Sequence, residues 1–352
     1  MKNINWFIAA ILFSSSSIAA DFPHRADVEA RSKAVGVGLT KASLLHREVG
    51  PGAEVAASQL LTHWANGSGP ITTAGTYSKM IQGNNKLLFV GNKGWTLRVY
   101  ADGTGVEYRN FPYRKAHLAA VPIDKQPTLS GLDAIGRDFI SKNLGGLVSL
   151  GQNDAIVGHS VRYERLGSQA VDGSPATTST VGAIVTYSRT LNGVDIVGAG
   201  SKIVVMFTAD GTPWGFSYDW PTYTTTTTQQ QVLPLTGIRK RHASLISNPA
   251  NLASDTEQHF ECGYYDVGVR YSKRDSNALI QMACVSQRVV AMVGDTQRYQ
   301  VNQDNGLFRM GKVDVIPAGV DISSDSSWPE ALQISGKGVG TNSSDPGANA
   351  SN

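Results

Sequence analysis

Between residues 128 and 221 the sequence changes from a helical to a strand pattern, and this order limits the folds that are open to the chain. Apolar residues at helical spacing predict one helix, whose shared face holds Leu132, Ile135, Phe139, Ile140, Leu144 and Leu147. Ser130 with Asp133 fits a capping box at the start of this helix, and Gly145-Gly146 is typical of its end. Such an apolar stripe needs a partner surface, and the nearest in sequence is the strand region that follows.

Four strand candidates follow the helix, at residues 157–163, 181–187, 202–208 and 213–220. The first two alternate apolar residues on one face, and the third is apolar on both faces, as a central strand is. Asp210-Gly211 predicts a tight turn between the last two strands. The predicted fold class is therefore α+β, with antiparallel sheets that each carry a helix packed on one face.

The rest of the chain divides around this helix-and-strand unit. In order, the predicted parts are a signal peptide (1–20), an N-terminal mixed region with a β-hairpin (21–121), the helix-and-strand unit (128–221), a second α+β unit (232–316) and a disordered tail (335–352). The Thr- and Gln-rich stretch 221–231 indicates a surface link or a solvated strand extension. Because helix-then-strand order occurs at 128–221 and again at 232–316, the two units are either a weak internal duplication or unrelated folds.

The N-terminus and the cysteines indicate an exported protein. Lys2 precedes the apolar run 6–13, and small residues at 17–20 offer a cleavage site, so we expect a signal peptide and a secreted or periplasmic location. The run is too short to span a bilayer, which takes about 20 residues, so we expect a soluble mature chain without a membrane span. Cys262 and Cys284 are an even pair and predict one disulfide, worth about 3 kcal/mol by chain entropy.

An aromatic stripe is the feature of the sequence most suggestive of binding. Trp214, Phe216, Tyr218 and Trp220 alternate along one predicted strand, which places all four on one sheet face. Either this face is buried beneath the helix, or it is an exposed platform for a polypeptide or a carbohydrate. We expect a core position for Phe216 and exposure for Trp220 at the strand end. The candidate ligand-binding residues are Trp214, Tyr218 and Trp220.

The sequence shows no motif for catalysis, a cofactor or a metal. It contains no G-x-S-x-G, P-loop or H-E-x-x-H pattern, and no two of its histidines stand at i, i+4. The formal net charge of +3 is too balanced to argue for nucleic acid, so we expect no nucleic-acid partner. The basic run 239–242 is either a solvated helix face or a contact for an anionic surface.

The stretch 187–200, with Asn192-Gly193-Val194, Gly198 and Gly200, followed by Asp210-Gly211, resembles the PepSY and FTP modules of thermolysin-like metallopeptidase propeptides. The resemblance covers residues 128–221, and Asp195 stands where that family often has proline. It implies inhibition, folding assistance or localisation of a peptidase that another chain supplies.

Together these observations predict an exported, soluble, non-catalytic binding protein, whose partner is a peptidase or another exported protein and which holds no cofactor. Two other classes stay open. One is a secreted hydrolase with an unrecognised active site, and the other is a structural component of the envelope or matrix.

Overall fold

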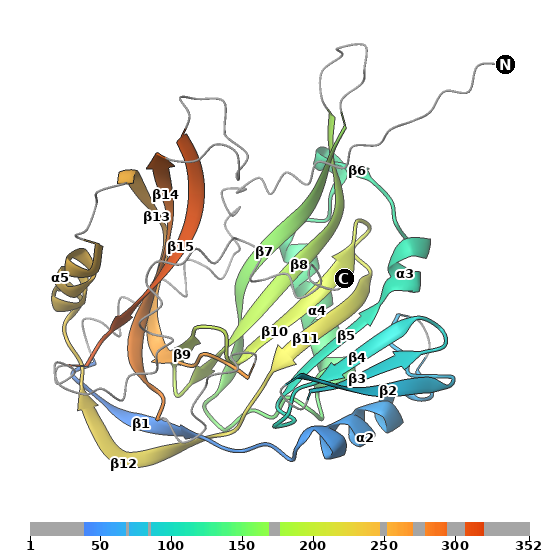
Figure 1. Ribbon diagram of the computed structural model, residues 1–352, viewed down its shortest axis with the longest axis horizontal. Coiled ribbons are helices and arrows are strands. Elements are labelled where there is room, and N and C mark those ends of the chain that lie inside the picture. Colours follow the sequence, from blue (N-terminus) through green and yellow to red (C-terminus); the bar gives the residue numbers. More distant parts are fainter. Residues whose placement is uncertain are drawn as a thin grey trace. The chain divides into compact units, whose positions relative to one another are not determined.

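The computed structural model describes residues 39–67, 70–83, 86–168, 177–246, 252–269, 279–293 and 307–319. The predicted signal peptide (1–20) and the predicted tail (335–352) lie outside this part. The chain forms two compact units (Figure 1). Unit 1 holds residues 49–189 and 201–221; the described residues of unit 2 are those of 39–48, 190–200 and the chain from 222 onward.

Unit 1 is built on one large sheet. Its helices are α2 (Ala53–Trp64), α3 (Phe111–Ala116), the short 3-10 helix η2 (Ile123–Lys125) and α4 (Leu129–Leu144). Its strands are β2 (Tyr77–Gln82), β3 (Lys86–Gly91), β4 (Trp95–Val99), β5 (Gly105–Asn110), β6 (Val121–Pro122), β7 (Ala155–Ser168), β8 (Thr177–Leu191, the last two residues in unit 2), β10 (Lys202–Thr208) and β11 (Pro213–Asp219). The strand order is β7-β8-β10-β11-β5-β4-β3-β2, and β6 pairs with β8. Every pair from β8 to β2 is antiparallel.

The same arrangement of a helix and four strands occurs twice in unit 1. Helix α2 precedes β2 to β5, and α4 precedes β7, β8, β10 and β11. The two meanders meet where β5 pairs with β11, with Tyr108 opposite Phe216. Each last hairpin turns through the same four residues, Ala-Asp-Gly-Thr, at 101–104 and at 209–212. In both turns the threonine N–H donates to the aspartate Oδ1 over 3.0 Å, which identifies the two as equivalent.

The predicted domain boundaries therefore need correction. The N-terminal region (21–121) and the helix-and-strand unit (128–221) share one sheet, because β5 and β11 pair edge to edge. The helix followed by four strands that occurs twice lies within unit 1, before residue 222. Pairing between strands so far apart in sequence leaves no local signal in either one.

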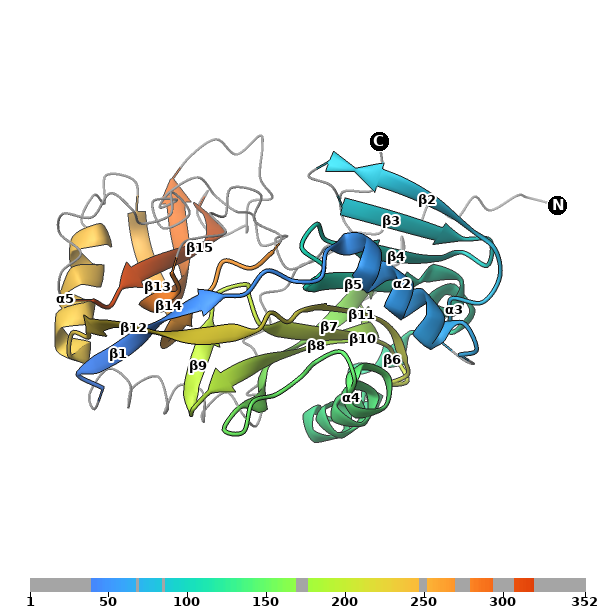
Figure 2. The same cartoon turned by 90° about the horizontal axis from the view of Figure 1, so that it is seen from below.

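Helices α2 and α4 pack on the same face of the unit 1 sheet, which we call the helix face (Figure 2). The buried side chains of this core include Trp64, Leu60, Leu132, Phe139, Leu144, Trp95, Leu97, Tyr108, Tyr187, Phe207 and Phe216. The predicted stripe of α4 is confirmed at four of its positions, Leu132, Phe139, Ile140 and Leu144, whereas Ile135 is exposed. Only glycine fits at position 136 without a shift of its surroundings, because a Cβ there would lie 2.1 Å from the Tyr187 hydroxyl oxygen.

The start of α4 differs from the predicted capping box. Thr128 is the N-cap, and its hydroxyl accepts a 3.1 Å hydrogen bond from the Gly131 N–H. Asp133, expected to complete a box with Ser130, instead binds the Arg137 guanidinium one turn later at 3.0 Å. The N-cap therefore lies two residues before the position that the predicted capping box gave it.

Replacing Thr128 with alanine is expected to lower the free energy of unfolding by about 1 kcal/mol, because the first turn of α4 loses its side-chain cap. Denaturant titration followed by circular dichroism measures the change. Ser130→Ala is the matched control, since Ser130 is exposed and should stay within about 0.5 kcal/mol. A larger loss of unfolding free energy in Ser130→Ala than in Thr128→Ala would instead support the predicted capping box at Ser130.

Unit 2 combines a two-stranded ribbon with a second sheet. Its elements are β1 (Lys41–Arg47), β9 (Val194–Val197), β12 (Tyr223–Gln231), α5 (Leu235–Ile246), β13 (Leu252–Tyr265), β14 (Gln281–Val293) and β15 (Leu307–Pro317). β1 pairs with β12, and the sheet runs β15-β14-β13-β9 with β9 parallel to β13. The Thr- and Gln-rich stretch is the mostly exposed strand β12, which confirms the solvated strand extension. An α+β class is thus observed, with larger sheets than the sequence indicated.

The predicted disulfide is present. Cys262 on β13 lies directly opposite Cys284 on β14, with 4.0 Å between the Cα atoms, and the two are bonded. Both cysteines are buried in the core of unit 2. Within the described ranges, no helix is long and apolar enough to cross a membrane.

Candidate functional site

The aromatic residues of β11 are buried. Trp214 is 3% exposed, Tyr218 6% and Trp220 7%, and Phe216 is fully buried. The interpretation of this strand as an exposed platform is therefore wrong, and so is the expected exposure of Trp220. The Trp220 indole N–H donates a 2.8 Å hydrogen bond to the Ser149 carbonyl, and the Arg189 guanidinium lies 5.2 Å from the ring centroid. These two contacts account for its burial at the strand end.

The four aromatic side chains do not share one face. The register of β10 against β11 shifts after Met206, which lies opposite Gly215, while Phe207 lies opposite Pro213. Trp214 is thus the extra residue of a β-bulge, and a bulge interrupts the alternation of faces. Its ring packs with Ile184 and Met206 on the sheet face opposite the helices, whereas Phe216 and Tyr218 belong to the core beneath them.

The face of the unit 1 sheet opposite α2 and α4, which we call the second face, carries a row of polar side chains. Cross-strand pairing sets Ser217 beside Glu107, Glu107 beside Arg98, and Arg98 beside Leu88. Three neighbouring strands, β11, β5 and β4, therefore each contribute one polar member, and Leu88 of β3 continues the row as an apolar residue.

Two arginines hold the carboxylate of Glu107. Arg98 donates to one oxygen at 3.0 Å, and the Arg109 guanidinium lies 3.1 Å from the other. Arg98 also donates a hydrogen bond of 3.1 Å to the Gln82 side-chain oxygen, and Arg109 donates one of 2.9 Å to the Phe216 carbonyl. Glu107 and Arg109 are buried, whereas Arg98 is about a quarter exposed. Both oxygens of the Glu107 carboxylate are engaged, so the carboxylate holds Arg98 in place. The exposed part of the cluster is therefore the guanidinium cation of Arg98.

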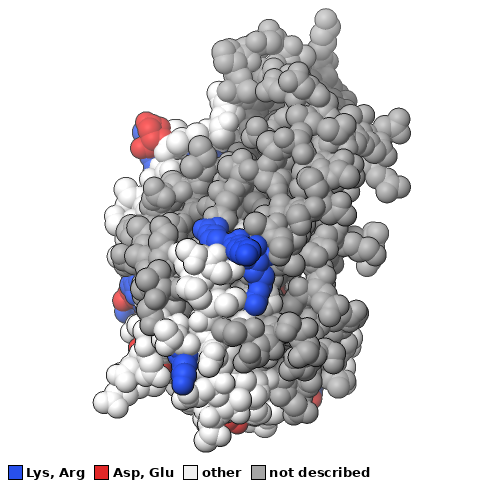
Figure 3. All heavy atoms as spheres, turned by 90° about the vertical axis from the view of Figure 1, so that its left-hand side faces the viewer, with Lys and Arg blue, Asp and Glu red and all other residues white. Residues whose placement is uncertain are grey.

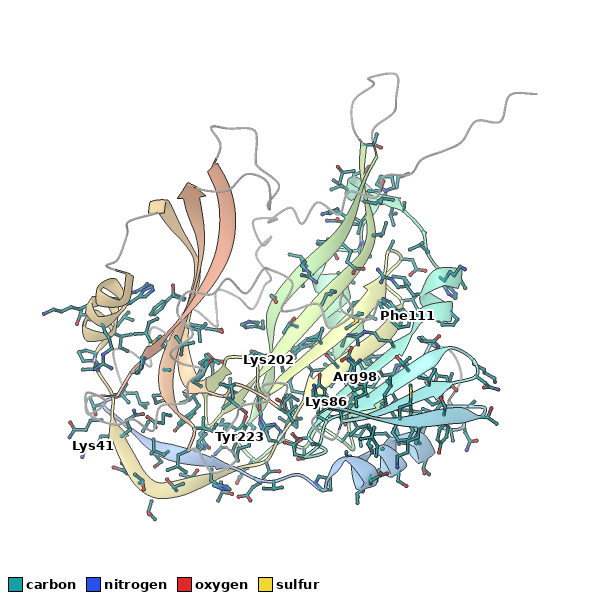
Figure 4. All side chains as sticks on the ribbon, viewed as in Figure 1. Lys41, Lys86, Arg98, Phe111, Lys202 and Tyr223 are labelled. Carbon is teal, nitrogen blue, oxygen red and sulfur yellow. A yellow bond between two sulfur atoms is a disulfide. The ribbon has the colours of Figure 1, made fainter. Side chains whose placement is uncertain are left out.

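The accessible part of the second face lies beside Arg98. Leu88 and Val90 of β3 are half-buried, and Phe111 at the start of α3 is 47% exposed. The Lys86 ammonium lies 5.0 Å from the centroid of the Tyr100 ring. Figure 4 labels Lys86, Arg98 and Phe111, which come from β3, β4 and α3. This surface therefore carries both apolar and cationic groups.

Groups with shifted pKa values in unit 1 have structural roles. Burial raises the pKa of Tyr108 to about 12, and its hydroxyl donates to the Thr72 carbonyl at 2.9 Å. Burial also raises the pKa of Tyr187, whose hydroxyl donates to the Asp133 carbonyl at 3.2 Å. Both tyrosines fasten backbone segments to the sheet. In the described part of the chain, no three His, Cys, Asp or Glu side chains come together as a metal site.

A second buried charge site lies in unit 2. Asp266 is fully buried and forms an ion pair with Arg47. The Tyr223 hydroxyl donates to it at 2.6 Å, and the Gly268 N–H at 2.8 Å. The site joins β1, β12 and the loop after β13, so it clamps unit 2 together. Sequence reasoning missed it, because its members lie far apart and match no motif.

The basic run 239–242 lies in α5. Figure 3 shows Lys and Arg side chains on the side of the molecule that carries this helix. Arg241 donates to the carbonyls of Pro317 and Gly319 at 2.6 and 2.9 Å, and burial lowers the pKa of its guanidinium. The Arg239 guanidinium lies 3.5 Å from the centroid of the Phe260 ring, and His242 is buried. Of this run only Lys240 is exposed, which favours packing over an anionic-surface contact.

Comparisons with known proteins give a likeness of fold. No family model matches the chain, and no curated protein matches it. A crystal structure of an uncharacterized protein from Eubacterium rectale ATCC 33656 is similar, with a TM-score of 0.52 and 9% sequence identity. The match covers 81% of this chain and 86% of that one. At this identity the likeness concerns the fold alone.

Proposed function

We propose that the protein is an exported, non-catalytic binding protein, and that the second face of unit 1 contacts another exported polypeptide. One observation carries the proposal. Half-buried Leu88 and Val90 lie beside Arg98, whose guanidinium is oriented by Gln82 and Glu107. A pre-oriented arginine within an apolar surface is a usual feature of protein–protein contacts, because little side-chain entropy is lost on binding.

The chemistry of the surface defines the partner. Arg98 and Lys86 favour a carboxylate, and Leu88, Val90 and Phe111 favour apolar side chains next to it. An exported thermolysin-like metallopeptidase is the first candidate. The reason is the resemblance of residues 128–221 to propeptide modules, and α4 followed by β7, β8, β10 and β11 has the helix-then-strand order that such modules share.

Phe111→Ala is expected to weaken binding to such a peptidase about thirtyfold, the loss that follows removal of an aromatic hot spot of about 2 kcal/mol. Lys86→Glu should weaken it further at low salt, because it reverses a charge. Isothermal titration with purified exported metallopeptidases of the source organism measures both effects, and peptide hydrolysis is followed in parallel.

Matched controls separate binding from folding. Ile123 has the same 47% exposure as Phe111, and Lys142 is an exposed lysine on α4, so Ile123→Ala and Lys142→Glu should leave affinity unchanged. Equal effects of test and control variants would contradict the proposed surface. Turnover of substrates by the pure protein, lost on one side-chain replacement, would instead establish a hydrolase.

A further inference from the structure

Strand β2 forms one edge of the unit 1 sheet. Among the residues that the structure describes, it pairs with β3 alone, and Figures 1 and 2 both show it as the outermost strand. All but the last of its six residues are exposed. Tyr77 is 49% exposed, Met80 46% and Ile81 74%. A sheet edge with large apolar side chains is therefore accessible along its length.

This edge has little of the protection that sheet edges usually carry. Natural edge strands are commonly interrupted by proline or bulges, or carry several charges that repel another strand. β2 contains one charged residue, Lys79, and its pairing with β3 is regular. The Lys79 ammonium is engaged by the Glu54 carboxylate of α2 in the same chain. The edge therefore presents strand backbone beside a neutralised ion pair, which suits pairing with another strand.

We propose that β2 pairs antiparallel with β2 of a second copy of this chain, about a twofold axis perpendicular to the sheet. The inference goes beyond the proposed function, since it concerns backbone pairing of the sheet edge with a second copy and not capture of another exported polypeptide. The molecule already contains this kind of junction. In unit 1, β5 and β11 join the two helix-and-strand repeats by antiparallel pairing, with α2 and α4 on one face.

The twofold axis restricts the register. Opposite residues must lie on the same sheet face, so the axis passes through a residue position. Centring on Lys79 would set two lysines directly opposite each other, which is unfavourable. Centring on Met80 sets Met80 opposite its own equivalent and Lys79 opposite Ile81 of the second copy. In that register each Lys79, paired with Glu54 of its own chain, faces an isoleucine rather than another lysine.

Cysteine cross-linking tests the pairing and its register together. The native cysteines are buried in a disulfide, so an added cysteine is the sole free thiol. Met80→Cys is expected to give a disulfide-linked dimer under mild oxidation, since opposite Cα atoms in antiparallel strands lie about 5 Å apart. Ser78→Cys alone should stay monomeric, but should cross-link when mixed with Gln82→Cys. Absence of both products would overturn the proposal.

Sedimentation velocity tests the association without a covalent link. The wild-type sedimentation coefficient is expected to rise with concentration. Met80→Lys and Met80→Glu should each remain monomeric, whereas their mixture should associate again, because opposite charges then meet at the axis. Lys142→Glu is the control and should behave as the wild type does.

The outcomes separate this inference from the proposed function. Phe111→Ala should leave sedimentation unchanged even where it weakens partner binding. If the wild type stays monomeric at every concentration, the proposed pairing of β2 with a second copy is overturned. A monomer whose peptidase binding is lost in Ile81→Lys, a change on the helix-face side of β2, would assign the edge to that other polypeptide instead.

Discussion

Replacing Asp266 with alanine is expected to destabilise unit 2 by about 3–5 kcal/mol, because the buried Arg47 guanidinium loses the carboxylate with which it forms an ion pair. The Tyr223 hydroxyl and the Gly268 N–H also lose their acceptor. Each unsatisfied buried group adds roughly 1–3 kcal/mol. Denaturant titration, followed by signals from both units, measures the change and shows whether unit 2 unfolds first.

Two further variants test the cause of this effect. Tyr223→Phe removes one hydrogen bond and should cost about 1 kcal/mol. The double replacement Arg47→Met with Asp266→Leu removes both charges and should recover most of the loss, because an apolar pair needs no desolvation. An Asp266→Ala variant within about 0.5 kcal/mol of wild type would mean that the ion pair does not clamp unit 2.

Local patterns in the sequence predict the elements well. Helix α4 buries most of the apolar stripe that the sequence predicts, and the chain turns at Asp210-Gly211 between β10 and β11. In contrast, β2 and β9 were missed. The segment Tyr77–Gln82 shows no clear alternation because its side chains are exposed on both faces. β9 spans only Val194–Val197, too short for a period to emerge.

Features that depend on distant partners could not be predicted. The junction of β5 with β11 joins residues more than a hundred positions apart, and the Arg47–Asp266 pair is separated by 219. The alternation rule failed at Trp214, because a bulge depends on the register of two strands and not on the sequence of one. For the same reason the second face was missed, since Glu107, Arg98 and Gln82 meet only across paired strands.

Phe216→Ala is expected to lower the free energy of unfolding of unit 1 by about 3–5 kcal/mol, the range for truncating a buried phenylalanine. The ring lies where both repeats meet. Its centroid is 5.2 Å from Trp64 of α2 and 5.7 Å from Phe139 of α4, and it stacks on Tyr108 of β5 at 5.6 Å. Truncation therefore leaves a cavity that removes contacts from both helices at once.

The same substitution at an exposed site is the control for this prediction. Phe111→Ala removes an equal number of atoms from a half-exposed ring, and it should stay near the 0.5 kcal/mol typical of surface changes, with a small addition from its contact with Trp214. If Phe216 couples the two repeats, its variant should still unfold unit 1 in one transition at a lower denaturant midpoint. Two separate transitions would show that the two repeats unfold independently. The pairing of β5 with β11 would then be too weak to couple them.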